Sequence, residues 1–296
     1  AGAGFIEGEP DPPMWFQDSV HEIFRSWRKI LESYDGERAM CGEAYVLPLT
    51  KMAQWVRPDE FHQTFNFRFL DSPWEKDSVV AAINESFHAF DQVGAPSTWV
   101  LNNHDTIRHA SRFGGDYGRA TASDGIGPDS PQPDNALGLA KARAATLFML
   151  GLPGASYIYQ GEELGLPEHT TLEAKNRQDP TFFRTNGQRV GRDGARVPLP
   201  WVKGGSSNGF SAAKEAWLPQ PESFANLSRD QQDQEGSTLL MYQQALELRK
   251  KLGLGEGSFE WISATDLLGY QNGGTLVIHN FGNSAAELPT GELLLS

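Results

Sequence analysis

The chain has 296 residues, 39% of them hydrophobic, and a formal net charge of −13 at pH 7. The length and hydrophobic content allow one large domain with a small appendage, and the acidic balance without a dense basic patch argues against DNA or RNA as a partner, so a small or neutral substrate fits better. No segment approaches the roughly 18 apolar residues of a membrane span, and the single Cys41 precludes a disulfide within the chain, so we expect a soluble protein of the cytoplasm.

The first predicted helix begins at Ser19. Ser19 and Glu22 have the spacing of a capping box, and apolar residues then repeat at helical spacing as far as Tyr34. After a short connection, residues 38–42 predict a short buried strand. This strand would deliver Glu43 to its carboxyl end, where a functional carboxylate and a solvated loop residue are the two alternatives.

The alternation of strands and helices continues along the chain. We predict further strands at residues 64–70, 99–101 and 155–160, and further helices at residues 79–90, 135–150 and 239–251. Strands that alternate with helices in this way form parallel sheets. Residues 166–228 contain many turn signals, and loops of this length in a compact domain are usually functional.

The last part of the chain has a different pattern. Residues 267–270 and 275–280 predict antiparallel strands of a small β appendage. The apolar run at residues 293–296 reads as a further strand with no closing segment, so we expect this appendage to be incomplete. We therefore divide the chain into residues 1–252 and residues 253–296.

A polar cluster follows the most apolar of these strands. Trp99-Val100-Leu101 suits a strand that is covered on both faces, and Asn102-Asn103-His104-Asp105 marks its exit. Because loops after the carboxyl ends of strands form the functional face of β/α proteins, His104 and Asp105 are candidate site residues. The alternative for Asp105 is the N-cap of a following helix.

Four segments carry a family pattern in the same order along the chain: Cys41-Gly42-Glu43-Ala44-Tyr45, Val100-Leu101-Asn102-Asn103-His104-Asp105, Gly154-Ala155-Ser156-Tyr157-Ile158-Tyr159-Gln160-Gly161-Glu162-Glu163-Leu164-Gly165 and Gly191-Arg192-Asp193-Gly194-Ala195-Arg196-Val197-Pro198. Together they resemble the α-amylase family of glycoside hydrolases, and most of all its α-glucosidase and oligo-1,6-glucosidase branch. The resemblance implies an α/β fold: the C-terminal half of a (β/α)₈ TIM barrel, with its last four strands and their helices in residues 1–252, followed by a small antiparallel β domain in residues 253–296.

The resemblance also assigns roles to particular residues. Glu43 matches the general acid/base, which protonates the glycosidic oxygen and then deprotonates water. Asp105 matches the third family carboxylate, which binds hydroxyls of the sugar in the −1 subsite and favours the transition state, and His104 matches a donor to the same sugar. Arg192 or Arg196 would hold a hydroxyl of the terminal glucose, with a structural ion pair in the loop as the alternative.

The chain departs from the family pattern at the nucleophile. In the family this residue is an Asp in a Gly-Phe-Arg-x-Asp type of strand, which precedes the helix that here begins near Ser19, and no such segment exists in this chain. The Asp residues ahead of the helix, Asp11 and Asp18, lie in a Pro-rich loop and at the helix start. We therefore expect the chain alone to be inactive and to represent the C-terminal half of a longer protein.

Three functions fit the pattern. The first is hydrolysis of terminal α-linked glucose from oligosaccharides by a retaining mechanism in the complete protein. The second is transfer of glucose by an enzyme of the trehalose or isomaltulose synthase type, and the third is a non-catalytic relative that serves as a scaffold. The retained Glu43, His104 and Asp105 argue against the third. The expected partner is a small α-glucoside or oligosaccharide.

No cofactor or metal is predicted. Glu43, Asp105 and Glu162 lie on separate strands and do not form a ligand cluster by spacing. An open doubly wound sheet with a bound cofactor is the alternative fold, and it is disfavoured because no Gly-x-Gly-x-x-Gly loop follows any predicted strand.

Overall fold

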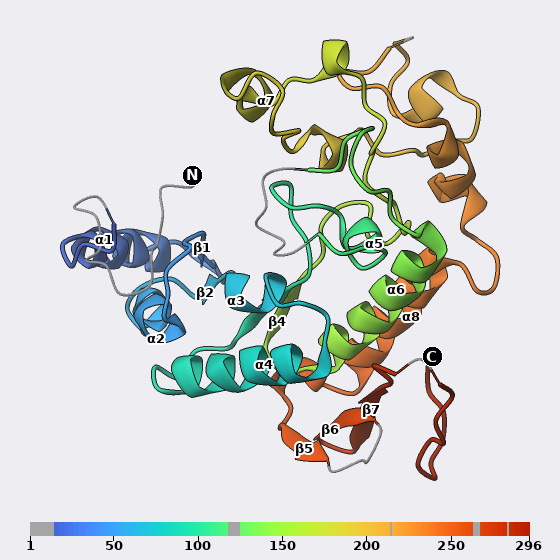
Figure 1. Ribbon diagram of the computed structural model, residues 1–296. Coiled ribbons are helices and arrows are strands. Elements are labelled where there is room, and N and C mark those ends of the chain that lie inside the picture. Colours follow the sequence, from blue (N-terminus) through green and yellow to red (C-terminus); the bar gives the residue numbers. More distant parts are fainter. Residues whose placement is uncertain (1–14, 118–124, 214, 263–266, 283) are drawn as a thin grey trace.

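A computed structural model describes residues 15–117, 125–213, 215–262, 267–282 and 284–296 (Figure 1), so Asp11 and its Pro-rich loop lie outside the described residues. The α-helices are α1 Val20–Glu32, α2 Leu49–Met52, α3 Phe67–Leu70, α4 Lys76–Asp91, α5 His109–Arg112, α6 Asn135–Gly151, α7 Pro180–Arg184 and α8 Thr238–Lys251. The strands are β1 Cys41–Gly42, β2 Gln63–Thr64, β3 Thr98–Val100, β4 Ala155–Tyr157, β5 Glu260–Ile262, β6 Leu268–Asn272 and β7 Thr275–His279. Short 3₁₀ turns and α7 lie in the long segment between β4 and α8.

The longer predicted helices are confirmed as α1, α4, α6 and α8. Two of them have side-chain caps at their first turn, since Asp134 accepts hydrogen bonds from the first amides of α6 and Ser237 accepts one at the start of α8. The capping box predicted for α1 is wrong, because the Ser19 side chain makes no cap hydrogen bond. Burial of Phe24 and a hydrogen bond between the buried side chains of His21 and Glu60 hold α1 in place instead.

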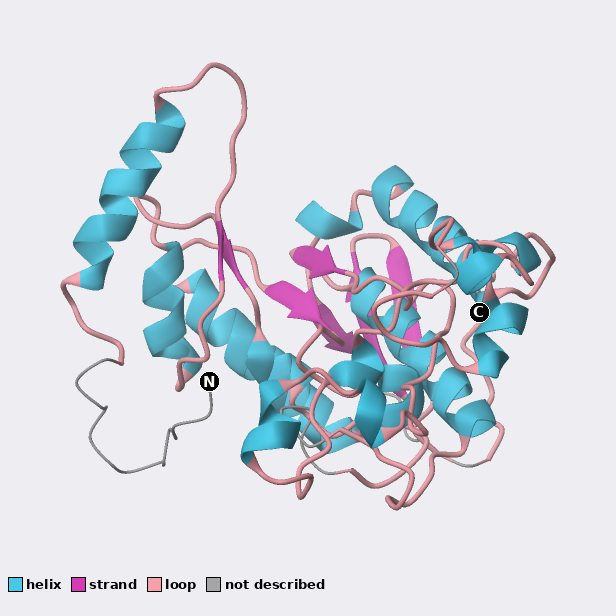
Figure 2. Ribbon diagram, turned by 90° about the horizontal axis from the view of Figure 1, so that it is seen from above, coloured by secondary structure: helices cyan, strands magenta, loops and turns pink. Residues whose placement is uncertain are grey.

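Two pairs of strands are parallel, β1 with β2 and β3 with β4, as the β/α rhythm predicts. Cys41 pairs with Gln63 between β1 and β2, and Thr98 pairs with Ala155 between β3 and β4. The backbone amide of Asn66 donates a hydrogen bond to the Thr98 carbonyl at 3.1 Å and so joins the two pairs of strands. Figure 2 shows β1 and β2 beside α1 at one side of the molecule. Residues that follow β1 and β3 therefore leave the carboxyl ends of parallel strands.

The predicted strand at residues 64–70 is wrong over most of its length. Only Gln63–Thr64 form β2, and Phe67–Leu70 form the short helix α3. Asn66 causes the change, because its side chain caps α3 by accepting a hydrogen bond from the Phe69 amide. Phe67, Phe69 and Leu70 are buried in α3, and a short apolar run fits a buried strand equally well, so the apolar pattern alone does not distinguish a strand from a helix here.

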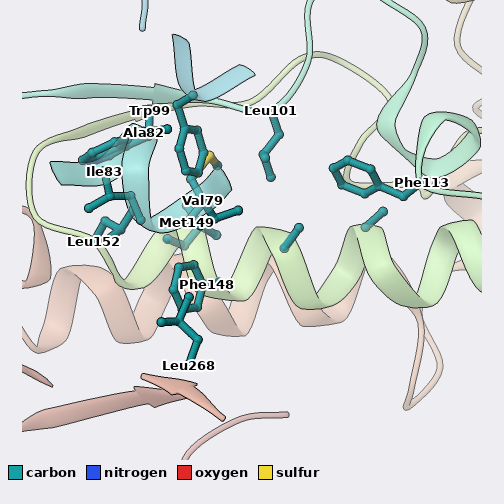
Figure 3. Close-up of a cluster of buried hydrophobic side chains, with 14 of the residues drawn as sticks. Val79, Ala82, Ile83, Trp99, Leu101, Phe113, Phe148, Met149, Leu152 and Leu268 are labelled. Atoms are coloured by element: carbon teal, nitrogen blue, oxygen red, sulfur yellow. The ribbon is translucent and has the colours of Figure 1, made fainter. Parts of the chain in front are cut away.

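The main hydrophobic core surrounds α6. Trp99 of β3 and Ile83 of α4 pack on one side of this helix, and Phe148 of the helix projects from the other side toward Leu268 of β6 (Figure 3). Trp99 is fully buried, as the sequence predicts for a strand covered on both faces. The core therefore fixes β3, and with it the turn that carries His104 and Asp105.

The predicted antiparallel strands are confirmed in a three-stranded sheet with the order β5-β6-β7. Leu268 and Tyr270 of β6 belong to the main core, and Asn272 donates hydrogen bonds to the carbonyls of Gly151 and Leu254. The sheet is thus packed onto the end of α6, and the division at residues 252 and 253 stays a prediction. The strand predicted at residues 293–296 is wrong, because these residues form no strand.

Helix α1 exposes one apolar face. Its large side chains follow helical spacing, as predicted, but several of them are roughly half exposed or more: Ile23 48%, Trp27 48%, Ile30 58% and, just beyond the helix, Tyr34 61%. On this helix Phe24 is the buried apolar residue, and the partly buried Val20 packs against the same cluster. Soluble proteins rarely leave such a stripe uncovered unless it binds something. Among the described residues, no helix has the length and apolar character needed to cross a membrane.

Candidate active site

Asp105, in the turn after β3, is the centre of the candidate site. Its Oδ1 accepts hydrogen bonds from Arg192 Nη1 at 2.8 Å and from Arg196 Nη2 at 2.6 Å, and His104 Nε2 lies 3.5 Å from the same oxygen. The Asp105 side chain is 38% exposed, and none of the described residues hydrogen bonds to its Oδ2. These predicted residues therefore meet at one oxygen of the Asp105 carboxylate.

The helix-cap alternative for Asp105 is wrong. The next helix is α5, and its N-cap position is Arg108. The Asp105 amide instead donates a hydrogen bond to Asn103 Oδ1 at 2.8 Å, which is a local turn. The Asp105 carboxylate therefore contacts two arginine side chains and does not cap a helix.

The ion-pair alternative for Arg192 is present together with the contact to Asp105. Arg192 Nε lies 2.6 Å from Asp179 Oδ2, and the Asp179 side chain has 0% exposure. This hydrogen bond raises the pKa of the Arg192 guanidinium above its usual value. Arg196 differs, since its Nε donates to the His104 carbonyl at 2.9 Å. Both arginines thus connect the 191–198 segment to the turn after β3.

Arg108 holds that segment against the strand ends. Its side chain is buried, and its Nη1 and Nη2 donate to the carbonyls of Gln160 and Ala195, each at 2.9 Å. Its backbone amide donates to Glu168 Oε2 at 3.0 Å. Burial raises the pKa of the Glu168 carboxyl to about 7, and the nearby Arg108 offsets only part of this effect. Arg108 therefore ties the exit of β3 to the exit of β4 and to the arginine-bearing segment.

Sequence reasoning missed three of these residues. Asp179 has a recognisable signal, because Asp followed by Pro180 is typical of a helix N-cap with Pro at the first helical position, and Asp179 does cap α7. Arg108 and Glu168 carry no such signal. Their burial results from contacts with residues far away in the sequence.

Glu43 follows β1 directly, as predicted, but the structure does not join it to this cluster. Its side chain is exposed, and it has no hydrogen bond or ion pair with any residue that the structure describes. The apolar enclosure typical of a general acid is likewise not formed around it by the described residues. Glu43 and Asp105 share only their setting, after the carboxyl ends of parallel strands.

Glu162 follows β4, and its buried side chain contacts other residues of the fold. Its Oε2 accepts a hydrogen bond from the Tyr242 hydroxyl at 3.3 Å, and Tyr242 also hydrogen bonds to Thr146 at 2.8 Å. Burial raises the pKa of the Glu162 carboxyl to about 8, and the hydrogen bonds and the nearby Arg108 offset only part of this effect. The described residues contain no group of three or more His, Cys, Asp or Glu side chains that could hold a metal ion.

The raised pKa of Glu162 predicts a pH-dependent stability. A carboxyl that binds its proton more tightly in the folded state contributes stability that is complete below the pKa of the unfolded chain and is lost as the pH rises through the folded-state pKa, at a slope of about 1.4 kcal/mol per pH unit for one proton. Burial raises the pKa of the Glu168 carboxyl as well, so the difference between the wild-type protein and Glu162→Gln over the interval from about pH 5 to 8 isolates the contribution of Glu162. We expect the thermal midpoint of the wild-type protein to fall across this interval and that of Glu162→Gln to fall less. Equal slopes would contradict the assignment.

Comparison with known proteins identifies the family. A family model described as "Alpha amylase, catalytic domain" matches residues 12–255. The chain belongs to the α-amylase family. The predicted resemblance is therefore confirmed, including its α-glucosidase branch, and the parallel strands with their helices are the α/β fold of this family.

Two curated relatives are named as α-glucosidases. The probable alpha-glucosidase of Rhizobium meliloti (strain 1021) is 31% identical over 241 residues, which cover 79% of this chain and 39% of the relative. The salivary alpha-glucosidase of Anopheles gambiae is 26% identical over 317 residues, which cover 97% of this chain and 48% of the relative. The chain of this α-amylase family member thus spans less than half of the length of these relatives.

Solved structures agree with the fold. The crystal structure of an alpha-glucosyl transfer enzyme has a TM-score of 0.72 and 26% identity, and the match covers 93% of this chain and 49% of that one. The trehalose-6-phosphate hydrolase of Bacillus licheniformis has a TM-score of 0.67 and 21% identity, and the match covers 89% of this chain and 50% of that one. The second likeness shows the fold alone.

Proposed function

We propose that the complete protein hydrolyses terminal α-linked glucose from small oligosaccharides by a retaining mechanism. The observation that carries this proposal is the cluster of His104, Asp105, Arg192 and Arg196 after β3. It brings residues with hydroxyl-binding and charge-stabilising chemistry to one strand end. The α-glucosidase names of the relatives support the substrate class.

In this mechanism Glu43 is the general acid/base. Its carboxyl group protonates the glycosidic oxygen as the bond to the leaving group breaks, and the carboxylate then removes a proton from the water that hydrolyses the glycosyl-enzyme. Asp105 lies beside the guanidinium groups of Arg192 and Arg196. Its Oδ2 would accept a hydrogen bond from a hydroxyl of the sugar, and its negative charge would favour the oxocarbenium-like transition state. His104 would donate to the same sugar ring.

The nucleophile of the proposed reaction belongs to a preceding strand of a complete (β/α)₈ barrel, of which β1 to β4 would be the last four strands. The share of the relatives' length that this chain covers supports this proposal. So does the apolar face of α1, since the stripe from Ile23 to Tyr34 has the size and spacing to pack against further barrel elements. Asp18 is not an alternative nucleophile, because it is exposed and residues 15–17, the described residues before it, form no strand.

A glucosyl transferase is the second candidate function. The likeness to an alpha-glucosyl transfer enzyme, at 26% identity, favours it specifically. The first steps of both reactions are the same, and they differ in whether water or a second sugar takes up the glucosyl group. A non-catalytic scaffold remains the weakest proposal, because a scaffold has no need for a guanidinium-bound carboxylate at this strand end.

We also propose the cytoplasm as the compartment, on the single Cys41 of this chain.

The complete protein and the 296-residue chain should differ in activity. With 4-nitrophenyl α-glucoside and with maltose, we expect the complete protein to release glucose and the chain alone to release none, because a retaining reaction requires a nucleophile about 5 Å from the acid/base. Chromatography of the products separates free glucose, from hydrolysis, and longer oligosaccharides, from transfer. Release of 4-nitrophenol by the chain alone, at a rate that Glu43→Gln abolishes, would contradict the proposal.

A further inference from the structure

One arginine of the candidate site connects two carboxylates of very different exposure. Arg192 directs Nε and Nη2 to the oxygens of Asp179, at 2.6 and 3.3 Å, and Nη1 to Asp105 Oδ1 at 2.8 Å. The Asp179 side chain has 0% exposure and the Asp105 side chain 38%. A paired, fork-like contact of this kind fixes the plane of a guanidinium group. The buried Asp179 carboxylate therefore determines where Nη1 of Arg192 lies relative to the more exposed Asp105.

The backbone around Asp179 leaves its carboxylate little freedom. Oδ1 accepts a hydrogen bond from the Thr181 amide at 2.9 Å, as the N-cap of α7, and Oδ2 accepts one from the Arg192 amide at 2.9 Å. The Asp179 amide donates to the buried Asp193 at 3.0 Å. Gly191 has φ of +81°, and a Cβ there would meet the Asp179 side chain at 3.0 to 3.2 Å. The chain thus closes tightly around this one carboxylate.

Asp179 also stays charged. Burial by itself would raise the pKa of its carboxyl, but the hydrogen bonds from Arg192 and from the Thr181 amide outweigh burial and hold the pKa well below its usual range. A buried carboxylate that keeps its charge is a strong and directional partner for a guanidinium group.

We propose that Asp179 is the positioning residue of the active site: it holds Arg192 so that a single N–H reaches Asp105 Oδ1 and leaves Oδ2 for the sugar. This inference rests on the proposed function, in which Asp105 contacts the glucosyl group. Arg196 reaches the same Oδ1 without a carboxylate of its own, since its other hydrogen bond goes to the His104 carbonyl. Of the two arginines, Arg192 is thus the one whose placement is built into the buried part of the fold.

The test is Asp179→Asn in the complete protein. Asn keeps the size of the side chain and is a good N-cap, but it loses the charge and turns one acceptor into a donor that faces Arg192. Loss of charge-assisted hydrogen bonds corresponds to a reduction of about 10- to 100-fold in kcat/KM, and we expect it mostly in kcat, because Asp105 would act on the transition state. The matched control is Asp134→Asn, the same change at the N-cap of α6 without an arginine partner, which should leave kcat and KM unchanged.

A double-mutant cycle separates positioning from a structural role. If Asp179 acts through Arg192, the losses of Asp179→Asn and Arg192→Lys should be strongly non-additive, because Lys cannot form the fork-like contact. Additive losses, or a loss of thermal midpoint in Asp179→Asn with an unchanged kcat/KM, would overturn the inference.

A second readout does not depend on glucosidase activity. The ¹H–¹⁵N signal of Arg192 Nε, identified by its absence in Arg192→Lys, should exchange slowly in the wild-type protein and at least about tenfold faster in Asp179→Asn. If the complete protein acts on no α-glucoside, the proposed function fails. The exchange rate still shows whether Asp179 holds the Arg192 side chain in place. An Arg192 signal that stays protected from exchange in Asp179→Asn would show that Asp179 does not hold Arg192, and would overturn the inference.

Discussion

Glu43→Gln in the complete protein should lower kcat/KM for maltose by about 10²- to 10⁴-fold, which is the usual contribution of a general acid/base. The Gln amide cannot donate a proton to the leaving sugar. For 4-nitrophenyl α-glucoside the loss in the first step should be smaller, because an acidic leaving group departs without protonation. The measurement is kcat/KM for both substrates, with the thermal midpoint as a check of folding.

Glu37→Gln is the matched control for this prediction. Glu37 is also exposed and lies on the amino-terminal side of β1, whereas Glu43 lies on the carboxyl side. The same change at Glu37 should leave both substrates unaffected. An equal loss in the two variants, or the same loss for both substrates in Glu43→Gln, would contradict the role of Glu43.

Asp105→Asn should reduce kcat/KM by about 10²-fold or more, because it removes a preorganised charge from the transition state. Its effect on stability should be small. The Asp105 side chain is 38% exposed, and an ion pair at such a position contributes about 0 to 1 kcal/mol to the free energy of unfolding. We therefore expect a collapse of activity with a nearly unchanged thermal midpoint in the complete protein.

Asp59→Asn controls for the loss of an ion pair as such. Asp59 accepts from Arg25 Nε at 2.9 Å and is 63% exposed, and it belongs to the surface beside α1. This variant should retain full activity and stability. Near-full activity of Asp105→Asn would return Asp105 to a structural role as the partner of Arg192 and Arg196.

Local patterns predicted the longer elements well. The helices α1, α4, α6 and α8 follow from their apolar spacing, and β3 follows from the uninterrupted apolar run that Trp99 begins. The meeting of Asp105 with Arg192 and Arg196 was predictable only through the family resemblance. Nothing in the local sequence brings residues so far apart in the chain to one oxygen atom.

The errors arise where hydrogen bonds of particular side chains outweigh the apolar pattern or where burial depends on distant residues. Residues 64–70 are apolar enough for a strand, but Asn66 bonds to the Thr98 carbonyl and caps a helix there. Arg108 has no local signal, and the local signal of Asp179 is that of a helix cap only, since the burial of both depends on which backbone groups surround them. The apolar spacing of α1 was predicted correctly, yet spacing alone does not reveal that much of this face is exposed.

The product that Glu43→Gln forms from 4-nitrophenyl α-glucoside with added azide tests the proposed mechanism most directly. If Glu43 is the acid/base, the variant still forms the glycosyl-enzyme, and azide replaces the water that Glu43 would have deprotonated. The product is then the α-glucosyl azide, with turnover rescued and the configuration retained, as ¹H NMR would show. Formation of the β-glucosyl azide would mean direct displacement by azide, which contradicts both the acid/base role of Glu43 and a nucleophile on a preceding strand.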